Sequence, residues 1–155
     1  MKTSNIVVIV LIVIIVIGGL YFFSMKPTTR TEVNPSNTEQ KNTTPILKVS
    51  SNPTLGSFLV ASNGMTLYLF TKDTVANVST CYDTCAVNWP PYTVSADQNL
   101  SADEGINGVL ATTTRTDGSK QLTYNGIPLY FWKFDKVVGD TTGQNVGGVW
   151  FVLKP

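Results

Sequence analysis

Cys81 and Cys85 are the residues of this sequence best suited to covalent chemistry, and the chain has no other thiol. Because they are four positions apart, one helical turn would place them on the same face, near enough for a disulfide. A structural disulfide is the expected role outside the cytoplasm. The alternative is a redox-active pair, although C-x-x-x-C differs from the thioredoxin-type C-x-x-C spacing and the chain has no histidine to lower a thiol pKa.

Acidic side chains offer a second kind of chemistry. Asp73 and Asp135 hold equivalent places in two similar segments of the chain, so they are the natural pair for carboxylate-based catalysis of the glycosidase type. The competing interpretation is that each aspartate caps the turn after its strand. Asp97, Asp103 and Glu104 are oxygen ligands near one another, but they lack the spacing of a calcium-binding EF-hand loop.

Composition argues against several other classes of site. The absence of histidine removes the commonest general base and metal ligand, and two thiolates leave only carboxylates to complete a zinc site. The glycine-rich segment 139–148 contains no lysine and leads into a predicted strand, whereas a phosphate-binding loop leads into a helix. A formal net charge of +1 provides no basic surface for nucleic acid. We therefore expect no cofactor, no metal and no nucleic-acid partner.

Aromatic side chains could form a binding surface. Trp89, Tyr92 and Trp150, together with Trp132, would make a platform for carbohydrate or peptide if their rings lay on the surface. Burial in the core is the commoner fate of such rings, because each carries a large apolar area.

The elements that position these residues follow an N-terminal region of different character. Residues 6–23 are an uncharged apolar run of 18 residues, which as a helix is about 27 Å long and can cross a bilayer. We interpret residues 1–25 as an uncleaved membrane anchor, with a cleaved signal peptide as the alternative. Residues 26–45 are polar and contain proline, which predicts a flexible linker with a coil dimension of roughly 25 Å.

Residues 46–155 are predicted to form one mostly β domain. Short β-prone runs are separated by Gly, Asn-Gly and Pro, and no apolar stretch keeps helical periodicity for three turns. Residues 58–70 and 121–132 each predict an antiparallel hairpin whose Asn-Gly pair makes a type I′ turn. A short helical turn is expected around the two cysteines, with Ser79 or Thr80 as its N-cap.

The two predicted hairpins are copies of one unit. At an offset of 62 residues, Asn63-Gly64-x-x-Leu67-Tyr68-x-Phe70-x-x-Asp73 aligns with Asn125-Gly126-x-x-Leu129-Tyr130-x-Trp132-x-x-Asp135. We call these segments the first and the second repeat. The tyrosine and the aromatic residue two positions later lie on the same side of a strand, so the four rings are expected to share one core layer. We interpret the motif as structural, and two copies predict approximate twofold symmetry.

The duplicated motif occurs with C-x-x-x-C-A-x-x-W-P-P between its copies and G-D-x-x-G-Q-x-x-G-x-W near the end. In this combination the chain resembles the bacterial secreted or lipoprotein repeat family, which is described by its Y-x-[FWY]-x-x-D motif. The resemblance covers residues 55–153, and it implies a location and a fold but no established activity. This chain differs from many such proteins because no cysteine follows its apolar run, which argues against lipid attachment there.

These features favour a cell-envelope module. We expect a single-pass cell-membrane protein, held by its N-terminal helix with the C-terminal domain outside the cytoplasm. We expect a structural or binding role, with an envelope protein or a carbohydrate as ligand. Two alternatives remain: a redox or electron-transfer accessory that uses Cys81 and Cys85, and an enzyme that uses Asp73 and Asp135.

Overall fold

The fold is known from a computed structural model that describes residues 44–155. Its strands are β1 (Leu47–Asn52), β2 (Gly56–Ala61), β3 (Tyr68–Phe70), β4 (Thr93–Val94), β5 (Leu110–Thr114), β6 (Lys120–Tyr124), β7 (Ile127–Pro128) and β8 (Trp150–Val152). The helical elements are α2 (Thr84–Asn88) and the 3-10 helix η1 (Val146–Gly148). The predicted anchor, residues 1–25, and all but the end of the predicted linker lie outside the described residues. Within residues 44–155, no helix has the length and apolar character needed to cross a membrane.

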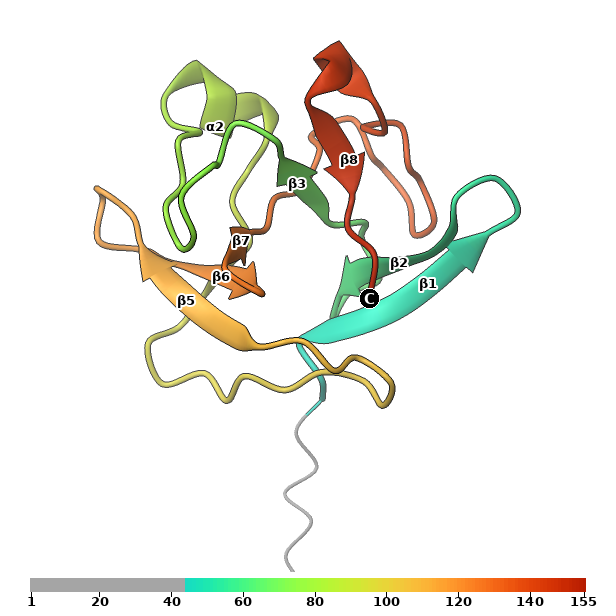
Figure 1. The fold of residues 1–155 in the computed structure, drawn as a ribbon, viewed down its shortest axis with the longest axis horizontal. Helices are drawn as coiled ribbons and strands as arrows, with labels where there is room; N and C mark the ends of the chain where they lie inside the picture. Colours follow the sequence, from blue (N-terminus) through green and yellow to red (C-terminus); the bar gives the residue numbers. More distant parts are fainter. Residues whose placement is uncertain (1–43) are drawn as a thin grey trace, which may run out of the picture. The chain divides into compact units, whose positions relative to one another are not determined.

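The strands of this part of the chain pair antiparallel in small sheets (Figure 1). β1 pairs with β2, β3 pairs with β8, and β6 pairs with β4, β5 and β7. The predicted closing strand is thus β8, and it completes a sheet with the first repeat rather than with the second. The prediction of a mostly β, antiparallel domain is confirmed.

The two Asn-Gly turns are built differently. Asn125 and Gly126 have φ values of 51° and 81°, which is the pair of positive angles that a type I′ turn requires. At the first turn only Gly64 has a positive φ, of 82°, and its N–H donates to Ala61 O at 2.8 Å. Asn63 therefore lies in a longer loop that ends in a glycine bulge. The prediction of a type I′ turn is confirmed in the second repeat and wrong in the first.

The longer first turn changes the alignment of the repeats upstream of it. Leu67 N–H donates to Leu59 O at 3.1 Å, and in the same way Leu129 N–H donates to Leu122 O at 3.0 Å. Leu67 and Leu129 are 62 residues apart, whereas Leu59 and Leu122 are 63 apart. The structural repeat therefore begins before the motif, where a fixed offset no longer detects it.

The two repeats meet at Tyr68 and Tyr130. Tyr68 N–H donates to Tyr130 O at 2.8 Å, and Tyr130 N–H donates to Tyr68 O at 3.0 Å. Such a reciprocal pair is the hydrogen-bonded pair of an antiparallel ladder, in which the two residues have equivalent surroundings. The expected twofold relation is therefore present at the contact between equivalent residues.

The short helix starts later than predicted. α2 begins at Thr84 with Asp83 in the N-cap position, so the assignment of the N-cap to Ser79 or Thr80 is wrong. The N–H and the hydroxyl of Thr80 both donate to Asp73 instead, which fixes this residue in the loop before the helix.

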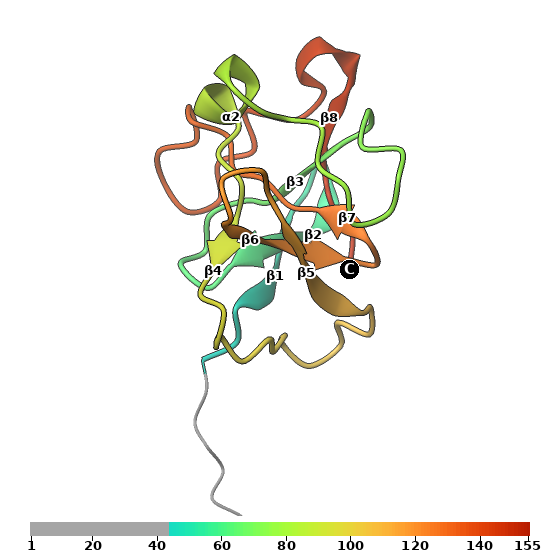
Figure 2. The same ribbon diagram turned by 90° about the vertical axis from the view of Figure 1, so that its left-hand side faces the viewer.

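Buried side chains form two clusters. One is largely aliphatic and contains residues of β1, β2 and β6 together with Leu67 and Leu129. The other is largely aromatic and contains Tyr68, Tyr130 and Cys81. α2 and β8 lie at one end of the domain and β1 and β5 toward the other (Figure 2). The aromatic cluster thus includes residues from the α2 and β8 end, Trp89 and Trp150 among them.

Two glycines test how much close packing between the repeats contributes to stability. Gly126 and Gly118 have similar φ values, 81° and 83°, so alanine is strained by about 1–2 kcal/mol at either. A Cβ at Gly126 would also lie 3.0 Å from Ala76 Cβ, whereas nothing lies within 4 Å of one at Gly118. We expect Gly126→Ala to lower the free energy of unfolding more than Gly118→Ala, as measured by urea titration. Equal losses would contradict this packing.

Candidate functional site

Each motif tyrosine reaches the aspartate of the other repeat. Tyr68 Oη donates to Asp135 Oδ2 at 2.7 Å, and Tyr130 Oη donates to Asp73 Oδ2 at 2.6 Å. Both tyrosines are fully buried. Burial, followed by the hydrogen bond to a carboxylate, raises the pKa of each phenol above its ordinary value. The two tyrosines are therefore neutral donors at physiological pH, and the crossed bonds connect the repeats.

The second oxygen of each carboxylate holds the loop that follows its own strand. Asp73 Oδ1 accepts hydrogen bonds from the N–H and the hydroxyl of Thr80, both at 2.7 Å. Asp135 Oδ1 accepts the same two bonds from Thr142, at 3.0 and 2.6 Å. Thr80 and Thr142 are also 62 residues apart. Each aspartate thus fixes its own loop and the tyrosine of the other repeat at once.

This geometry bears on the alternative of a catalytic aspartate pair. A general acid or base needs an oxygen within hydrogen-bond reach of its substrate. Both oxygens of Asp73 and of Asp135 already accept hydrogen bonds from the protein, and Asp135 is buried. These bonds give both carboxylates a structural role, which is the turn-cap interpretation of the sequence.

The remaining acidic residues form no metal site in the described part of the chain. Groups of three or more carboxylate or cysteine ligands close enough to hold an ion are absent from residues 44–155. Asp97, Asp103 and Glu104 accordingly do not make a calcium site there. The glycine-rich segment 139–148 leads through η1 into β8, as the sequence indicates.

Four aromatic rings stack in a column within the aromatic cluster. Ring centroids are 4.1 Å apart between Phe70 and Trp150, 3.9 Å between Trp150 and Trp89, and 4.0 Å between Trp89 and Trp132. The interplanar angles are 14°, 4° and 28° in that order. Phe70 and Trp132 hold equivalent positions in the repeats, and they form the two partly exposed ends of the column.

The motif tyrosines pack edge-on against the middle of this column. Tyr68 meets Trp89 with ring centroids 5.4 Å apart, and Tyr130 meets Trp150 at 5.2 Å. Edge-to-face contacts of this kind are favourable because the positive ring edge meets the negative face. The four motif rings therefore share one cluster, with the tyrosines inside and Phe70 and Trp132 outside.

Three aromatic residues that we considered for a binding surface are buried. Trp89, Tyr92 and Trp150 are 4%, 9% and 4% exposed. Both tryptophans fill the column between the repeats, and the Tyr92 hydroxyl donates to Ile46 O at 2.7 Å. The proposal of a surface platform is therefore wrong for these three residues, and the exposed aromatic area lies instead at Trp132 and its neighbour in sequence, Phe134.

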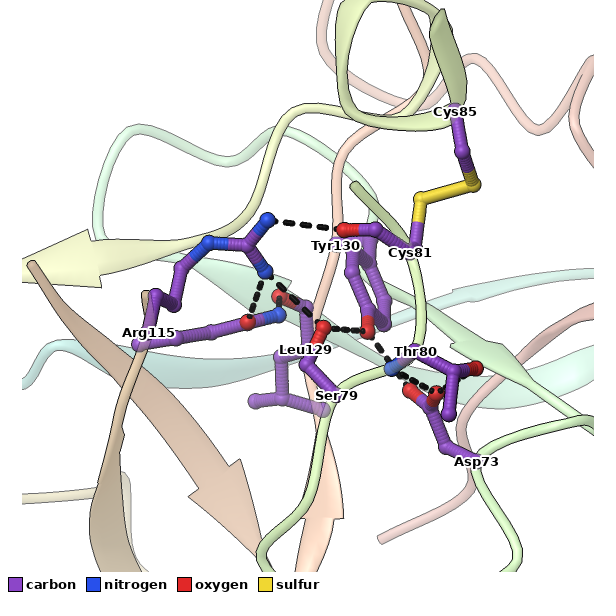
Figure 3. The surroundings of a disulfide bond; sticks show 9 residues. Asp73, Ser79, Thr80, Cys81, Cys85, Arg115, Leu129 and Tyr130 are labelled. Carbon is purple, nitrogen blue, oxygen red and sulfur yellow. Dashed lines mark hydrogen bonds between the residues drawn. A yellow bond between two sulfur atoms is a disulfide. The ribbon is translucent and has the colours of Figure 1, made fainter. Parts of the chain in front are cut away.

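Cys81 and Cys85 are joined in a disulfide, with their Cα atoms 5.2 Å apart (Figure 3). Cys81 is fully buried, whereas Cys85 is partly exposed. The equivalent positions of the second repeat are Gly143 and Gly147. A Cβ at Gly143 would lie 2.8 Å from the Tyr68 ring, so no side chain fits there. The bridge is thus a feature of the first repeat alone.

A buried arginine holds the segment that carries the disulfide (Figure 3). Arg115 donates to Cys81 O at 2.7 Å, to Ser79 Oγ at 2.9 Å and to Gln121 Oε1 at 2.6 Å. Its guanidinium carbon lies 4.4 Å from the centroid of the Tyr82 ring. These acceptors are uncharged, and among the described residues Arg115 Nε has no hydrogen-bond partner.

Sequence reasoning missed both this arginine and the two threonines. Thr80 and Thr142 could have been found by extending the 62-residue offset beyond the motif aspartates. Arg115 carries no such signal, because it follows an ordinary β-prone run and its acceptors are distant in sequence. It reaches the motif through Ser79, whose Oγ lies 2.7 Å from Tyr130 Oη.

The sequence model of a family described as a secreted repeat of unknown function matches residues 49–93 and 111–154. These two segments make up more than half of the chain, and each contains one copy of the motif. The chain belongs to this family. Comparisons with curated proteins and with solved structures gave no match. In this secreted-repeat protein the first matched segment ends in β4 and the second just after β8.

The raised tyrosine pKa values predict a loss of stability at alkaline pH. An ordinary tyrosine has a pKa of about 10. With a higher pKa in the folded state, the folded protein keeps phenol protons that the unfolded chain releases. The tyrosines therefore contribute fully to stability below about pH 10, and this contribution decreases as the pH rises above that value.

We expect the free energy of unfolding to fall above about pH 10 by up to about 1.4 kcal/mol per pH unit for each of the two tyrosines. Urea titrations at a series of pH values measure this slope. A Tyr68→Phe, Tyr130→Phe variant, less stable at neutral pH, should show a flatter decline. A variant that declines as steeply as the parent would contradict this explanation.

Proposed function

We propose that this secreted-repeat protein is a cell-envelope module, anchored in the membrane by its N-terminal helix, whose folded domain acts outside the cytoplasm by binding or as a structural part. The observation that carries the non-catalytic role is the hydrogen bonding of the motif aspartates. All four of their oxygens accept bonds that hold the two repeats together. The residues by which the family is described thus build the domain and leave function to its loops.

Three features support the proposed location. The family is described as secreted. The domain contains a disulfide, and disulfides persist in oxidising compartments outside the cytoplasm. Residues 6–23 are long and apolar enough to span a bilayer as a helix, and a polar segment separates them from β1.

A binding role is supported by the contrast between core and loops. Loops carried by a rigid scaffold are the usual place of binding residues. Here the buried column and the crossed bonds fix the scaffold, while Val87 of α2 and Phe134 expose large apolar side chains. An envelope protein or a carbohydrate is the ligand class that we propose for this domain.

The location is tested on protein isolated from membranes. We expect it to resist extraction with alkaline carbonate and to have the full-length mass, because one apolar helix is a stable anchor. An Ile12→Arg, Ile15→Arg variant should become extractable, since each arginine at a helix centre costs about 2.5–3.5 kcal/mol of insertion free energy. A mass that lacks the first 25 or so residues, or extraction of the parent, would contradict the anchor.

A redox role remains the second candidate, because Cys85 is partly exposed and could be attacked by an external thiol. The same preparation tests it by alkylation, before and after mild reduction of the folded protein. A structural disulfide should stay protected until the protein is unfolded in reductant. Alkylation of both cysteines after mild reduction would favour the redox accessory.

A further inference from the structure

The loop after the second motif presents apolar and basic side chains together. Phe134, Val137 and Val138 are 55%, 63% and 66% exposed. Lys133 and Lys136 are exposed in the same loop, and their Nζ atoms lie 4.8 and 5.9 Å from the centroid of the Phe134 ring. In Figure 1 this segment is the orange-red loop to the right of β8. We call residues 133–138 the second-repeat loop.

The loop is held in shape by its own backbone contacts. Asp140 Oδ2 accepts hydrogen bonds from the N–H groups of Lys136 at 2.7 Å and Val137 at 3.0 Å, and these bonds lower the pKa of Asp140. Asp135, the other acid of this region, is buried and bonded to Tyr68. Both carboxylates are thus directed to the protein, and the exposed lysines are the charges available to a ligand.

The equivalent loop of the first repeat has a different character. Val75 is the counterpart of Val137 and is similarly exposed, at 61%. At the other positions the first repeat has Thr71 for Lys133, Lys72 for Phe134, Thr74 for Lys136 and Ala76 for Val138. Because the two loops follow the same motif, the shared fold does not require phenylalanine, a second valine and two lysines at this place.

We propose that the second-repeat loop is a membrane-contact surface that inserts Phe134 and Val137 among the headgroups of an anionic bilayer. Exposed aromatic and aliphatic side chains beside lysines are the composition of segments that bind at a membrane interface. Lysines near an anionic surface are attracted to it, so Lys133 and Lys136 complement the lipid phosphates.

The chain outside the described residues indicates why lipid is the occupant. This inference rests on the proposed anchor, because the apolar run of residues 6–23 would place a bilayer next to the domain. A linker with a coil dimension of roughly 25 Å lets the domain turn this loop toward the surface. Tethering also raises the effective concentration to the millimolar range, so a weak interfacial affinity is sufficient.

The test uses the full chain in vesicles of phosphatidylglycerol and phosphatidylcholine, with an environment-sensitive fluorophore on a cysteine introduced at one loop. Val137→Cys reports the second-repeat loop, and Val75→Cys is the matched control. The native disulfide is left oxidised, so only the introduced cysteine is labelled. Lipids carrying a spin label near the headgroup should quench the probe at position 137 several-fold more than the probe at position 75.

A second variant gives the second-repeat loop the residues of the first: Lys133→Thr, Phe134→Lys, Lys136→Thr and Val138→Ala, in the Val137→Cys background. Quenching at position 137 should fall to the level of position 75. Equal quenching at the two positions, or quenching that these substitutions leave unchanged, overturns the contact surface. Carbonate extraction of the chain from the vesicles would instead show that the anchor is wrong, and the loop proposal would fail with it.

Discussion

The structure depends on a hydrogen bond between a buried tyrosine of one repeat and the aspartate of the other. Tyr68 and Asp135 form this bond on one side, and Tyr130 and Asp73 form it on the other. A buried phenol without an acceptor, or a buried carboxylate without its donor, costs about 1–3 kcal/mol or more. Neither repeat can supply both members of a pair in this arrangement, so each completes the other.

The remaining core follows from that crossing. Once Tyr68 and Tyr130 pair through their backbones, their rings lie against Trp89 and Trp150, and the stacked column fills the space between the repeats. The same aspartates order the loops after each motif through Thr80 and Thr142. The loops therefore project from a fixed frame, and differences in their residues can change what each repeat contacts without changing the fold.

The repeat, the mostly β class and the second turn could be predicted from sequence, because Asn-Gly chemistry and period-two aromatics are local signals. The crossing could not, since alternation along a strand shows which residues share a face and not which residue lies opposite. Trp89 and Trp150 were placed on a possible surface for the same reason, because only the tertiary fold stacks them. Arg115 was missed because its acceptors come from three separate segments.

The most direct test is a double-mutant cycle on Tyr68→Phe and Asp135→Asn, compared with a cycle on Tyr68→Phe and Asp73→Asn. Residues in one hydrogen-bonded pair couple by about 0.5–3 kcal/mol, whereas residues without a shared contact are additive within about 0.5 kcal/mol. Urea unfolding of the single and double variants gives both coupling energies. The crossed arrangement predicts clear coupling of Tyr68 to Asp135 and near additivity with Asp73. Coupling to the aspartate of the same repeat, with additivity across the repeats, would contradict it.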